Sequence, residues 1–535
     1  RWATHGRPSD ENAHPHLDCR GEIAVVHNGI IQNYRRLKEE LLRRGHVFSS
    51  ETDTEVVAHL IEDKYRVYRD FYRAFKEAIM EIEGSYALAV ITLHEPDKIF
   101  FAKKDSPLII GVGDGYNFVA SDIPAILEYT RKAIIVHDNE LGYITPSSIY
   151  LEELGRGSID WSKRVRIIEW SIEDASKGGY PHYMLKEIHE QPRAIRDTLY
   201  GLMNEPVVVE AAKLLLDARR IYTTAAGTSY HAGLYYSLAT ARLAKQPVYS
   251  FIASEYPSIA DSVGEDDVLV AISQSGETID VLMAVRAFRE RGGRVIAVSN
   301  IVDSAIPRES DLAIYMRAGP EIGVAATKTF TAQTTVLAWL AIAHGEEAGV
   351  LDRSEAGELR DWLAKAPQLV AESIAANESL AIKLAEWIAG KHSMYYLSRW
   401  IGVPVAMEGA LKLKEIAYIH AESYPAGESK HGPIALVENM FPVLFVIPGV
   451  DWVEKLLLGN IQEMRARGAY IIGVAAEDTG LADQLDLWFR VPCGHWILTP
   501  LTHTPPLQLL AYYTAIRRGY DPDKPRNLAK TVTVE

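Results

Sequence analysis

The pattern of apolar and polar positions divides the chain into two parts. In the first part, short apolar runs such as residues 23–27 are separated by Gly, Pro and Asp turns, and helical periodicity covers 54–64. In the second part, apolar strands alternate with longer amphipathic helices, as in the predicted strand 268–272, helix 278–291 and strand 295–298. This alternation is typical of βαβ units. We predict an α+β domain followed by parallel-sheet α/β structure.

The second part contains an internal repeat. Residues 267–272 are echoed by 442–447, and 291–298 by 467–474, about 175 residues downstream. Two copies of one α/β domain are therefore expected, joined near residues 350–380. A polar, Gly-containing linker is expected before the two copies. The predicted boundaries are a first domain at 1–165, the linker at 166–180, α/β domains at 181–350 and 351–520, and an irregular tail at 521–535.

Composition narrows the class of protein. The 535 residues are 48% hydrophobic and 24% charged, with a formal charge of −15, and this acidity argues against a nucleic-acid partner. Two cysteines, Cys19 and Cys493, cannot form a disulfide framework. No apolar stretch is long enough for a membrane span. We expect a cytoplasmic, multidomain protein.

Hydroxyl-rich turns follow two predicted strands. Residues 273–278, Ser-Gln-Ser-Gly-Glu-Thr, lead from a buried strand into a helix, and Gly227, Thr228 and Ser229 repeat the arrangement earlier. Hydroxyls and free N–H groups at a helix N-terminus suit a phosphate, although one such turn could serve only as a helix cap. Two turns favour a sugar phosphate. The equivalent turn of the second copy, 448–451, lacks hydroxyls, so only the first copy is expected to bind it.

A charged helix is predicted over residues 408–422 of the second copy. Glu408, Lys412 and Glu415 are spaced four and three apart and so share one face, whereas Lys414 points elsewhere. This face is either a solvated ion-pair ladder or a partly buried site in which a carboxylate acts as a base. His431, just before Gly-Pro, is either structural or a further acid or base.

These motifs closely resemble the glucosamine-6-phosphate synthase family, the glutamine–fructose-6-phosphate aminotransferases. The resemblance rests on the 273–278 turn, the 408–415 helix and the 525–535 tail, and in the first domain on 1–6, 12–16, 26–30 and 50–55. It implies an N-terminal-nucleophile glutaminase domain with αββα layers, followed by two parallel-sheet sugar isomerase (SIS) domains. Because the chain begins at Arg1 and lacks the family's N-terminal Cys, we expect a glutaminase domain truncated at its N-terminus.

The resemblance assigns roles in the glutaminase domain. Arg1, Thr4, His5 and Asp53 are expected to hold the charged ends of glutamine. Asn28 and Gly29 are expected to form the oxyanion hole. Trp2 is expected to gate the path of ammonia to the second site.

It also assigns roles in the isomerase half. Lys530 is expected to form a Schiff base with the open-chain ketose, Glu415 to move a proton between C1 and C2, and His431 to help open the ring. Glu408 and Lys412 are expected to support the site. The residues expected to bind the sugar phosphate are Thr228, Ser229, Ser273, Gln274, Ser275 and Thr278, with Val324 lining the sugar pocket.

The chain departs from the family pattern at a few positions. Cys19 lies in a turn without a free amine, so it is not expected to replace the nucleophile, and both cysteines are interpreted as inert thiols. Ala226 and Ala326 stand where family members carry Cys and often Ser, which is expected to tune the pocket only. The histidines at 5, 14, 16 and 27 are explained by the resemblance, and no metal or organic cofactor is expected.

Three hypotheses follow. The first is a bifunctional enzyme that hydrolyses glutamine, channels ammonia, and aminates and isomerises fructose 6-phosphate, as a homodimer. The second is an isomerase-only or ammonia-dependent enzyme. The third is a sugar-phosphate-binding regulator, which would need the phosphate-binding turn but no proton-transfer residues.

Overall fold

The computed structural model describes residues 5–168, 170, 174, 176–203, 205–492 and 494–531. The chain forms two compact units, which divide between Ala175 and Ser176, and Thr531 near the end of the chain belongs to the first unit. This point lies within the predicted linker 166–180, although its first two residues still pair in a sheet of the first unit.

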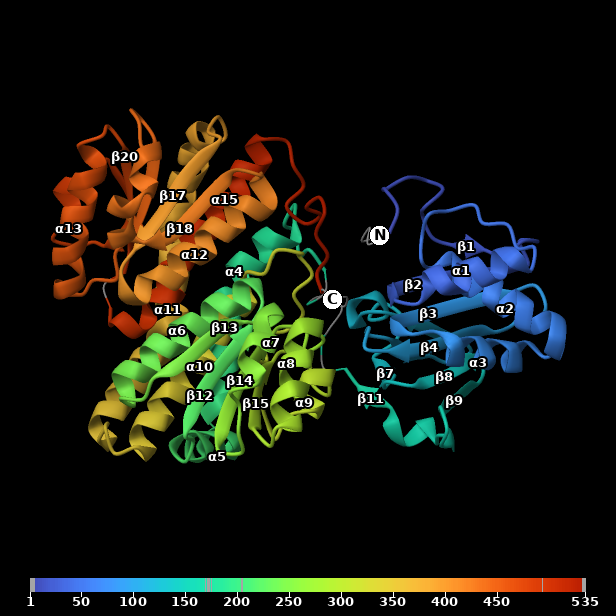
Figure 1. Ribbon diagram of the computed structural model, residues 1–535. Coiled ribbons are helices and arrows are strands. Elements are labelled where there is room, and N and C mark those ends of the chain that lie inside the picture. The colour runs from blue at the N-terminus through green and yellow to red at the C-terminus, as the bar shows by residue number, and fades with distance from the viewer. Residues whose placement is uncertain are drawn as a thin grey trace. The chain divides into compact units, whose positions relative to one another are not determined.

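Within the described residues, the first unit contains two antiparallel sheets, three α-helices and two short 3₁₀-helices (Figure 1). The larger sheet has the order β1 (His16–Leu17), β2 (Ile23–Ile31), β3 (Gly84–Thr92), β4 (Ile99–Lys104), β8 (Glu140–Ile144), β9 (Ile149–Glu153) and β10 (Gly157–Ser158). The smaller has the order β11 (Arg166–Ile167), β7 (Lys132–Ile135), β5 (Ile109–Val112) and β6 (Asn117–Ala120). The helices are α1 (Tyr34–Arg43), α2 (Glu55–Tyr68) and α3 (Phe71–Glu81).

Alternation along the strands places the larger sheet between two apolar layers. Phe100 and Leu88 pack with the helices, whereas their neighbours Phe101 and Ala87 pack toward the smaller sheet. Successive side chains of a strand point to opposite faces, so each strand serves both layers. Helix α2 begins one residue after the start of the predicted helix 54–64 and extends four residues beyond its end.

The second unit contains two five-stranded parallel sheets with the same strand order. The first is β13 (Val248–Ile252), β12 (Arg220–Ala225), β14 (Asp267–Ser273), β15 (Arg294–Ser299) and β16 (Leu312–Tyr315). The second is β18 (His420–Pro425), β17 (Ser393–Ser398), β19 (Pro442–Val446), β20 (Tyr470–Ala476) and β21 (Leu487–Val491). The predicted repeat is therefore a repeat of topology.

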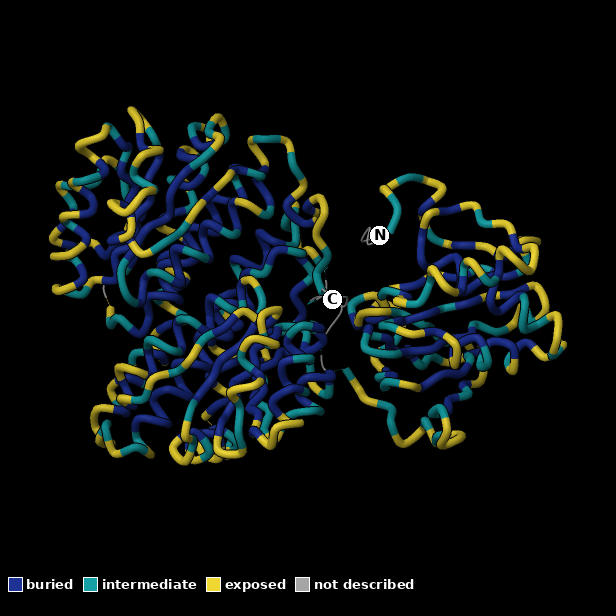
Figure 2. The backbone as a smooth tube through the Cα atoms, in the orientation of Figure 1, coloured by how far each residue is buried: buried dark blue, intermediate teal, exposed yellow. Residues whose placement is uncertain are grey.

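Helices cover both faces of each parallel sheet, and Figure 2 shows the sheets as buried. Val270 of β14 and Leu444 of β19 belong to one continuous core that both sheets share. The opposite faces have separate cores. The helices of the first copy are α4 (Tyr183–Met203), α5 (Pro206–Leu216), α6 (Gly227–Leu243), α7 (Tyr256–Ala260), α8 (Ile279–Glu290), α9 (Ala305–Arg308) and α10 (Lys328–Glu347), and those of the second are α12 (Val403–Lys412), α13 (Asp451–Arg465), α14 (Thr499–Thr502) and α15 (Thr504–Arg517).

One long helix, α11 (Arg353–Ile388), occupies the predicted join between the copies. It starts with a capping box, in which Asp352 accepts from the N–H of Glu355 and the Glu355 side chain accepts from the N–H of Asp352. The apolar side of α11 is part of the shared core. The join is thus a structural element of the core.

The predicted helix 408–422 is wrong in its last part. The α-helix ends at Lys412, a π-helical turn, η5 (Leu413–Ala417), follows, and residues 420–422 belong to strand β18. Tyr418 adopts a left-handed φ of 54°, which ends the helical segment. Pairing with β17 at the sheet edge then determines the extended conformation.

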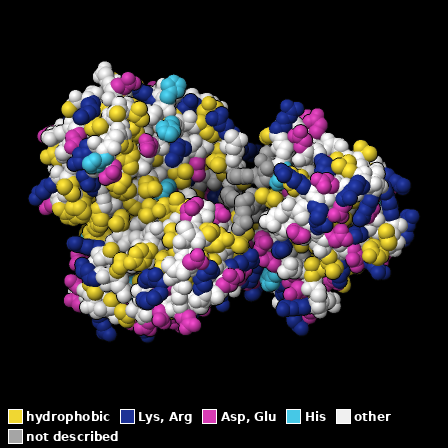
Figure 3. All heavy atoms as spheres, viewed as in Figure 1, with side chains coloured by type: hydrophobic (Ala, Val, Ile, Leu, Met, Phe, Trp, Pro, Cys, Tyr) yellow, Lys and Arg dark blue, Asp and Glu magenta, His cyan; other side chains and the backbone are white. Residues whose placement is uncertain are grey.

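The surface carries mixed charge. On the face shown in Figure 3, acidic and basic side chains are interspersed on both units. Within the described residues, no helix combines the length and apolar character needed to cross a membrane.

Candidate active site

The hydroxyl-rich turn lies where strand β14 ends, as the sequence predicts. The Ser273 hydroxyl lies 2.9 Å from that of Thr278 and accepts the N–H of Gly276 at 3.0 Å. Gly276 has a φ of +67°, and a Cβ there would lie 1.9 Å from the Ser304 hydroxyl oxygen. Only glycine fits this closely packed turn. Gln274 and Ser275 are half-buried in the same turn.

The second hydroxyl-rich turn begins helix α6. Ser229 accepts a hydrogen bond from the side-chain amide of Gln333 at 2.8 Å, and Thr228 is buried. Strands β12 and β14 are adjacent and parallel, so the turns that follow them lie at the same edge of the sheet. The structure therefore brings together the two turns that the sequence only suggested were related.

The charged face of α12 connects the two copies. Lys412 Nζ donates to the Thr228 hydroxyl at 3.0 Å, and this hydroxyl donates to Glu408 Oε1 at 3.1 Å. Lys412 also forms ion pairs with Glu408 at 3.3 Å and with Glu415 at 2.6 Å. The other oxygen of Glu408 lies 2.9 Å from Nδ1 of His231 on α6.

Burial distinguishes this network from a solvated ion-pair ladder. The side chains of Glu408 and Lys412 are 0% exposed, and that of Glu415 is 21% exposed. Burial acts to lower the pKa of Lys412, but the two adjacent carboxylates outweigh it and raise the pKa above its usual value. Lys412 is therefore a fixed positive charge, and Glu415 is the member of the network that a ligand can reach. Its position in the π-helical turn η5 fits the frequent occurrence of such turns at functional sites.

Lys530, in the tail, is held by groups that sequence analysis missed. Its Nζ donates to Glu321 Oε2 at 2.6 Å and to the carbonyl oxygen of Gly323 at 2.8 Å. Burial opposes ionisation of Glu321, but the Lys530 charge and hydrogen bonds from Thr327 and Thr329 lower its pKa to about 2. Val324 is the next residue after Gly323 and is half-buried.

A second buried carboxyl, Glu187 on α4, supports the same segment. Its Oε1 accepts the N–H groups of Ile322 at 2.5 Å and Gly323 at 3.1 Å. Burial and the nearby Glu321 carboxylate raise the pKa of Glu187 to about 7. Glu187, Glu321 and Lys530 are too far apart in the chain for spacing to connect them, so only the fold could identify this group.

His431 lies apart from these contacts. It is exposed at the end of the 3₁₀-helix η6 (Ala426–His431). Its role in ring opening stays a prediction.

The first unit brings together the described part of the predicted glutamine site. Asp53 Oδ2 accepts the N–H of Ile31 at 2.8 Å, and Asp53 Oδ1 lies 3.6 Å from Nδ1 of His5. Asn28 and Gly29 lie near the end of β2, where a Cβ on Gly29 would lie 2.1 Å from the Ser85 carbonyl oxygen. Arg1, Trp2 and Thr4, together with Cys493, lie outside the described residues.

Comparisons with known proteins agree with this organisation. Residues 4–128 match the family model described as a glutamine amidotransferase domain, and residues 214–343 and 388–518 match the SIS domain model. One similar solved structure is the C-terminal domain of glucosamine-fructose-6-phosphate aminotransferase from Francisella tularensis. It is 36% identical to this chain, covers 65% of this chain and 100% of its own length, and has a TM-score of 0.61. A protein described as a putative phosphosugar isomerase, from Silicibacter pomeroyi, is 30% identical, covers 64% of this chain and 100% of its own length, and has a TM-score of 0.54.

Fold and site together define a glutamine amidotransferase domain joined to two SIS domains. Full-length relatives narrow the class. The glutamine–fructose-6-phosphate aminotransferase (isomerizing) of Pyrobaculum aerophilum is 53% identical over 100% of this chain and 88% of its own length. That of Sulfurisphaera tokodaii is 50% identical over 100% and 87%. The chain belongs to the family of isomerizing glutamine–fructose-6-phosphate aminotransferases.

Proposed function

We propose that this protein converts fructose 6-phosphate and glutamine into glucosamine 6-phosphate and glutamate. The observation that carries the proposal is the buried network from Thr228 through Lys412 to Glu415. It connects the phosphate-type turns of one SIS domain to an accessible carboxylate of the other. Family membership supplies the substrates.

The proposed reaction uses these groups in sequence. The Ser273–Thr278 turn and the N-terminus of α6 hold the phosphate through hydroxyls and N–H groups. The Lys530 amine attacks C2 of the open-chain ketose, and loss of water gives a Schiff base, from which ammonia released from glutamine displaces the lysine. Glu415 then takes a proton from C1 and returns one to C2, while the proton of the C1 hydroxyl passes to the imine nitrogen, which leaves an aldehyde at C1 and the amine at C2.

The contacts of Lys530 and Lys412 support these roles. Lys530 must lose a proton before it attacks, and its contact with Glu321 Oε2 at 2.6 Å fixes the position of the amine. Lys412 Nζ lies 2.6 Å from Glu415 Oε2 and holds this carboxylate in position. We further propose that the glutamine-binding residues are His5 and Asp53, with Arg1 and Thr4, that Asn28 and Gly29 form the oxyanion hole, and that Trp2 gates ammonia.

We also propose a cytoplasmic homodimer. The support is the homodimer that the family resemblance implies, in which the exposed His431 at the end of η6 would reach toward the neighbouring subunit. Light scattering coupled to size-exclusion chromatography tests this point. A monomer that retains full activity would contradict it.

The test of function uses glutamine labelled with ¹⁵N in its amide. The protein is incubated with fructose 6-phosphate and this glutamine, and the sugar phosphates are identified by mass spectrometry. Glucosamine 6-phosphate carrying ¹⁵N is the expected product. Glucosamine 6-phosphate formed only from added ammonium, or glucose 6-phosphate alone, would favour the ammonia-dependent or isomerase-only alternative. Binding of fructose 6-phosphate without turnover would favour the regulator.

A further inference from the structure

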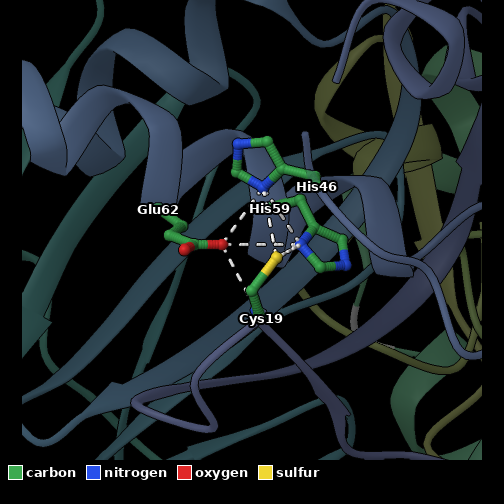
Figure 4. Close-up of side chains that lie close together, drawn as sticks. All are labelled: Cys19, His46, His59 and Glu62. Carbon is green, nitrogen blue, oxygen red and sulfur yellow. Dashed lines mark hydrogen bonds and ion pairs between the residues drawn. The ribbon is translucent and has the colours of Figure 1, made fainter. Parts of the chain in front are cut away.

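Four potential metal ligands converge in the first unit. The side chains of Cys19, His46, His59 and Glu62 point toward one another (Figure 4). Cys19 lies in the turn between β1 and β2, His46 in the loop between α1 and α2, and His59 and Glu62 one turn apart on α2. One ligand atom from each residue lies within 4.8 Å of all the others.

Five of the six separations approach the edges of a tetrahedron, and the sixth, between Cys19 Sγ and the Glu62 oxygen, is at most 4.8 Å. Nδ1 of His46 lies 3.3 Å from Nδ1 of His59 and 3.1 Å from Glu62 Oε2, and His59 Nδ1 lies 3.6 Å from the same oxygen. Cys19 Sγ lies 3.6 Å and 3.4 Å from the two imidazole nitrogens. Tetrahedral zinc, with bonds of about 2.0–2.3 Å, requires edges of about 3.3–3.8 Å.

The outer contacts orient the ligand atoms toward the centre. Nε2 of His46 lies 3.6 Å from Asp63 Oδ1, and Nε2 of His59 lies 3.5 Å from Glu55 Oε1. A neutral imidazole carries one proton, and a proton on each Nε2, facing a carboxylate, leaves both Nδ1 lone pairs directed at the centre. Arg66 pairs with Oε1 of Glu62, so Oε2 faces the other ligands.

Burial makes this collection of lone pairs costly without a cation. The side chains of His46 and His59 are 0% and 1% exposed, and that of Glu62 is 6% exposed. Two imidazole lone pairs, a carboxylate oxygen and a sulfur atom then share one pocket, in which the thiol offers one proton and the Cys19 N–H donates to Glu62 Oε2 at 3.2 Å. A divalent cation satisfies all four and, with a thiolate and a carboxylate among its ligands, forms a neutral centre.

We propose that Cys19, His46, His59 and Glu62 bind one zinc ion. Thiolate and imidazole ligands favour zinc over magnesium or calcium, and four protein ligands describe a structural site, with no open position for catalysis. Cys19 is then a ligand, in contrast to the inert thiol and the absence of metal expected from the sequence. The site is independent of the proposed aminotransferase activity.

The ion would cross-link three segments of the glutaminase domain. These are the turn after β1, the loop between α1 and α2, and α2 itself. The same loop presents Asp53, which accepts the N–H of Ile31. Zinc would thus stabilise the loop that carries a predicted glutamine-binding residue.

Metal content and cobalt spectroscopy of the full chain test the site directly. Protein freed of metal by a chelator is titrated with Zn²⁺ against a chromophoric zinc chelator, and bound metal is counted by mass spectrometry. We expect one zinc per chain. Co²⁺ in its place should give the visible bands of tetrahedral cobalt and a near-ultraviolet thiolate-to-cobalt band. Failure to bind either ion with the chain folded would overturn the proposal.

Variants assign the ligands. Cys19→Ser should abolish the thiolate-to-cobalt band and weaken zinc binding by at least the 10–100-fold known for outer-shell changes. Cys493→Ser is the matched control for Cys19→Ser. His392→Gln changes an exposed histidine of the second unit and is the matched control for His59→Gln. Unchanged zinc binding in Cys19→Ser would contradict the assignment.

A labelling experiment needs no variant in the cluster. Cys19 is exposed, so in a Cys493→Ser background a thiol reagent should modify it readily in metal-free protein. Zinc should slow the modification at least tenfold, and a chelator should restore it, with the site located by peptide mass spectrometry. A modification rate independent of zinc would overturn the proposal even if Cys19→Ser failed to fold.

Discussion

The two parallel sheets of the second unit have one strand order but carry different chemistry. In the first copy, β14 ends in a turn of hydroxyls, with Ser273 and Thr278 2.9 Å apart. In the second copy, the equivalent strand β19 is followed by Pro448 and Gly449, without hydroxyls. The second copy instead carries Glu408, Lys412 and Glu415 on α12 and η5.

The difference shows how a repeated fold can divide one site between its copies. The carboxyl end of a parallel sheet offers a turn and a helix N-terminus for a phosphate in either copy. Here the hydroxyls lie in one copy, and the charged group that contains the proposed base lies in the other. Thr228 joins them, because its hydroxyl contacts both Glu408 and Lys412.

The largest expected effect comes from removing Glu415, the proposed base of the second copy. Glu415→Gln keeps the size of the side chain but cannot accept a proton, so kcat should fall by about 10²–10⁴-fold while the affinity for fructose 6-phosphate changes little. Steady-state kinetics with glucosamine 6-phosphate detection measures this. Glu422→Gln, the same change on the exposed side of β18, is the control and should retain activity. Undiminished turnover in Glu415→Gln would show that another residue is the base.

The buried charge between the copies gives the next effect. Lys412→Met leaves Glu408 without its cation in a fully buried position and should lower the free energy of unfolding by about 3–5 kcal/mol. Lys414→Met, at the exposed neighbouring lysine, should change it by less than about 0.5 kcal/mol. Urea unfolding monitored by circular dichroism measures both. Equal stability of the two variants would mean that the network does not hold the copies together.

Two glycines with nearly the same φ angle allow the turns of the two copies to be compared. Gly276 has a φ of +67° and Gly449 a φ of +66°, but a Cβ would meet the Ser304 hydroxyl at 1.9 Å in the first and nothing within 4 Å in the second. Gly449→Ala should cost about 1–2 kcal/mol, from the left-handed backbone alone. Gly276→Ala should cost a further ~1–3 kcal/mol from overpacking and raise the KM for fructose 6-phosphate. A raised KM in Gly449→Ala would contradict the assignment of phosphate to the first copy only.

The smallest effect concerns the pH dependence of stability. Burial and Glu321 raise the pKa of Glu187 from 4.5 to about 7, so the folded state binds the proton more tightly than the unfolded chain. Its stabilising contribution is complete below about pH 4.5 and is lost as pH rises through about 7. Glu187→Gln should flatten the decline of unfolding free energy between those values, as measured by urea unfolding across the range. Glu210→Gln, at an exposed carboxyl of α5, is the control and should leave the pH dependence of the unfolding free energy unchanged. An unchanged pH dependence in Glu187→Gln would contradict the prediction, because it would mean that Glu187 is already ionised at acidic pH.

Much of the fold could be predicted from local pattern. The strand 268–272 and the helix 278–291 match β14 and α8 to within one residue, because apolar periodicity and turn residues act locally. The helix 408–422 was predicted too long, since its last residues are extended by pairing with β17. Periodicity within one segment does not report such pairing.

The candidate site was only partly predictable for the same reason. Spacing placed Glu408, Lys412 and Glu415 on one face but left open whether that face was solvated. Burial against α6 decided it, since both Glu408 and Lys412 are fully covered. Glu187 and Glu321 were missed, because nothing local connects them to Lys530.

By itself, the sequence determined the two-part architecture, the repeat, the hydroxyl turn and, through its motifs, the family. These properties follow from the order and spacing of residues along short segments. Tertiary structure alone decided which distant groups share a site: Thr228 with Lys412, Lys530 with Glu321, and Cys19 with His46, His59 and Glu62. The physical reason is that hydrogen bonds, ion pairs and metal coordination act over a few ångströms of space, and sequence distance sets no limit on which residues the fold brings that close.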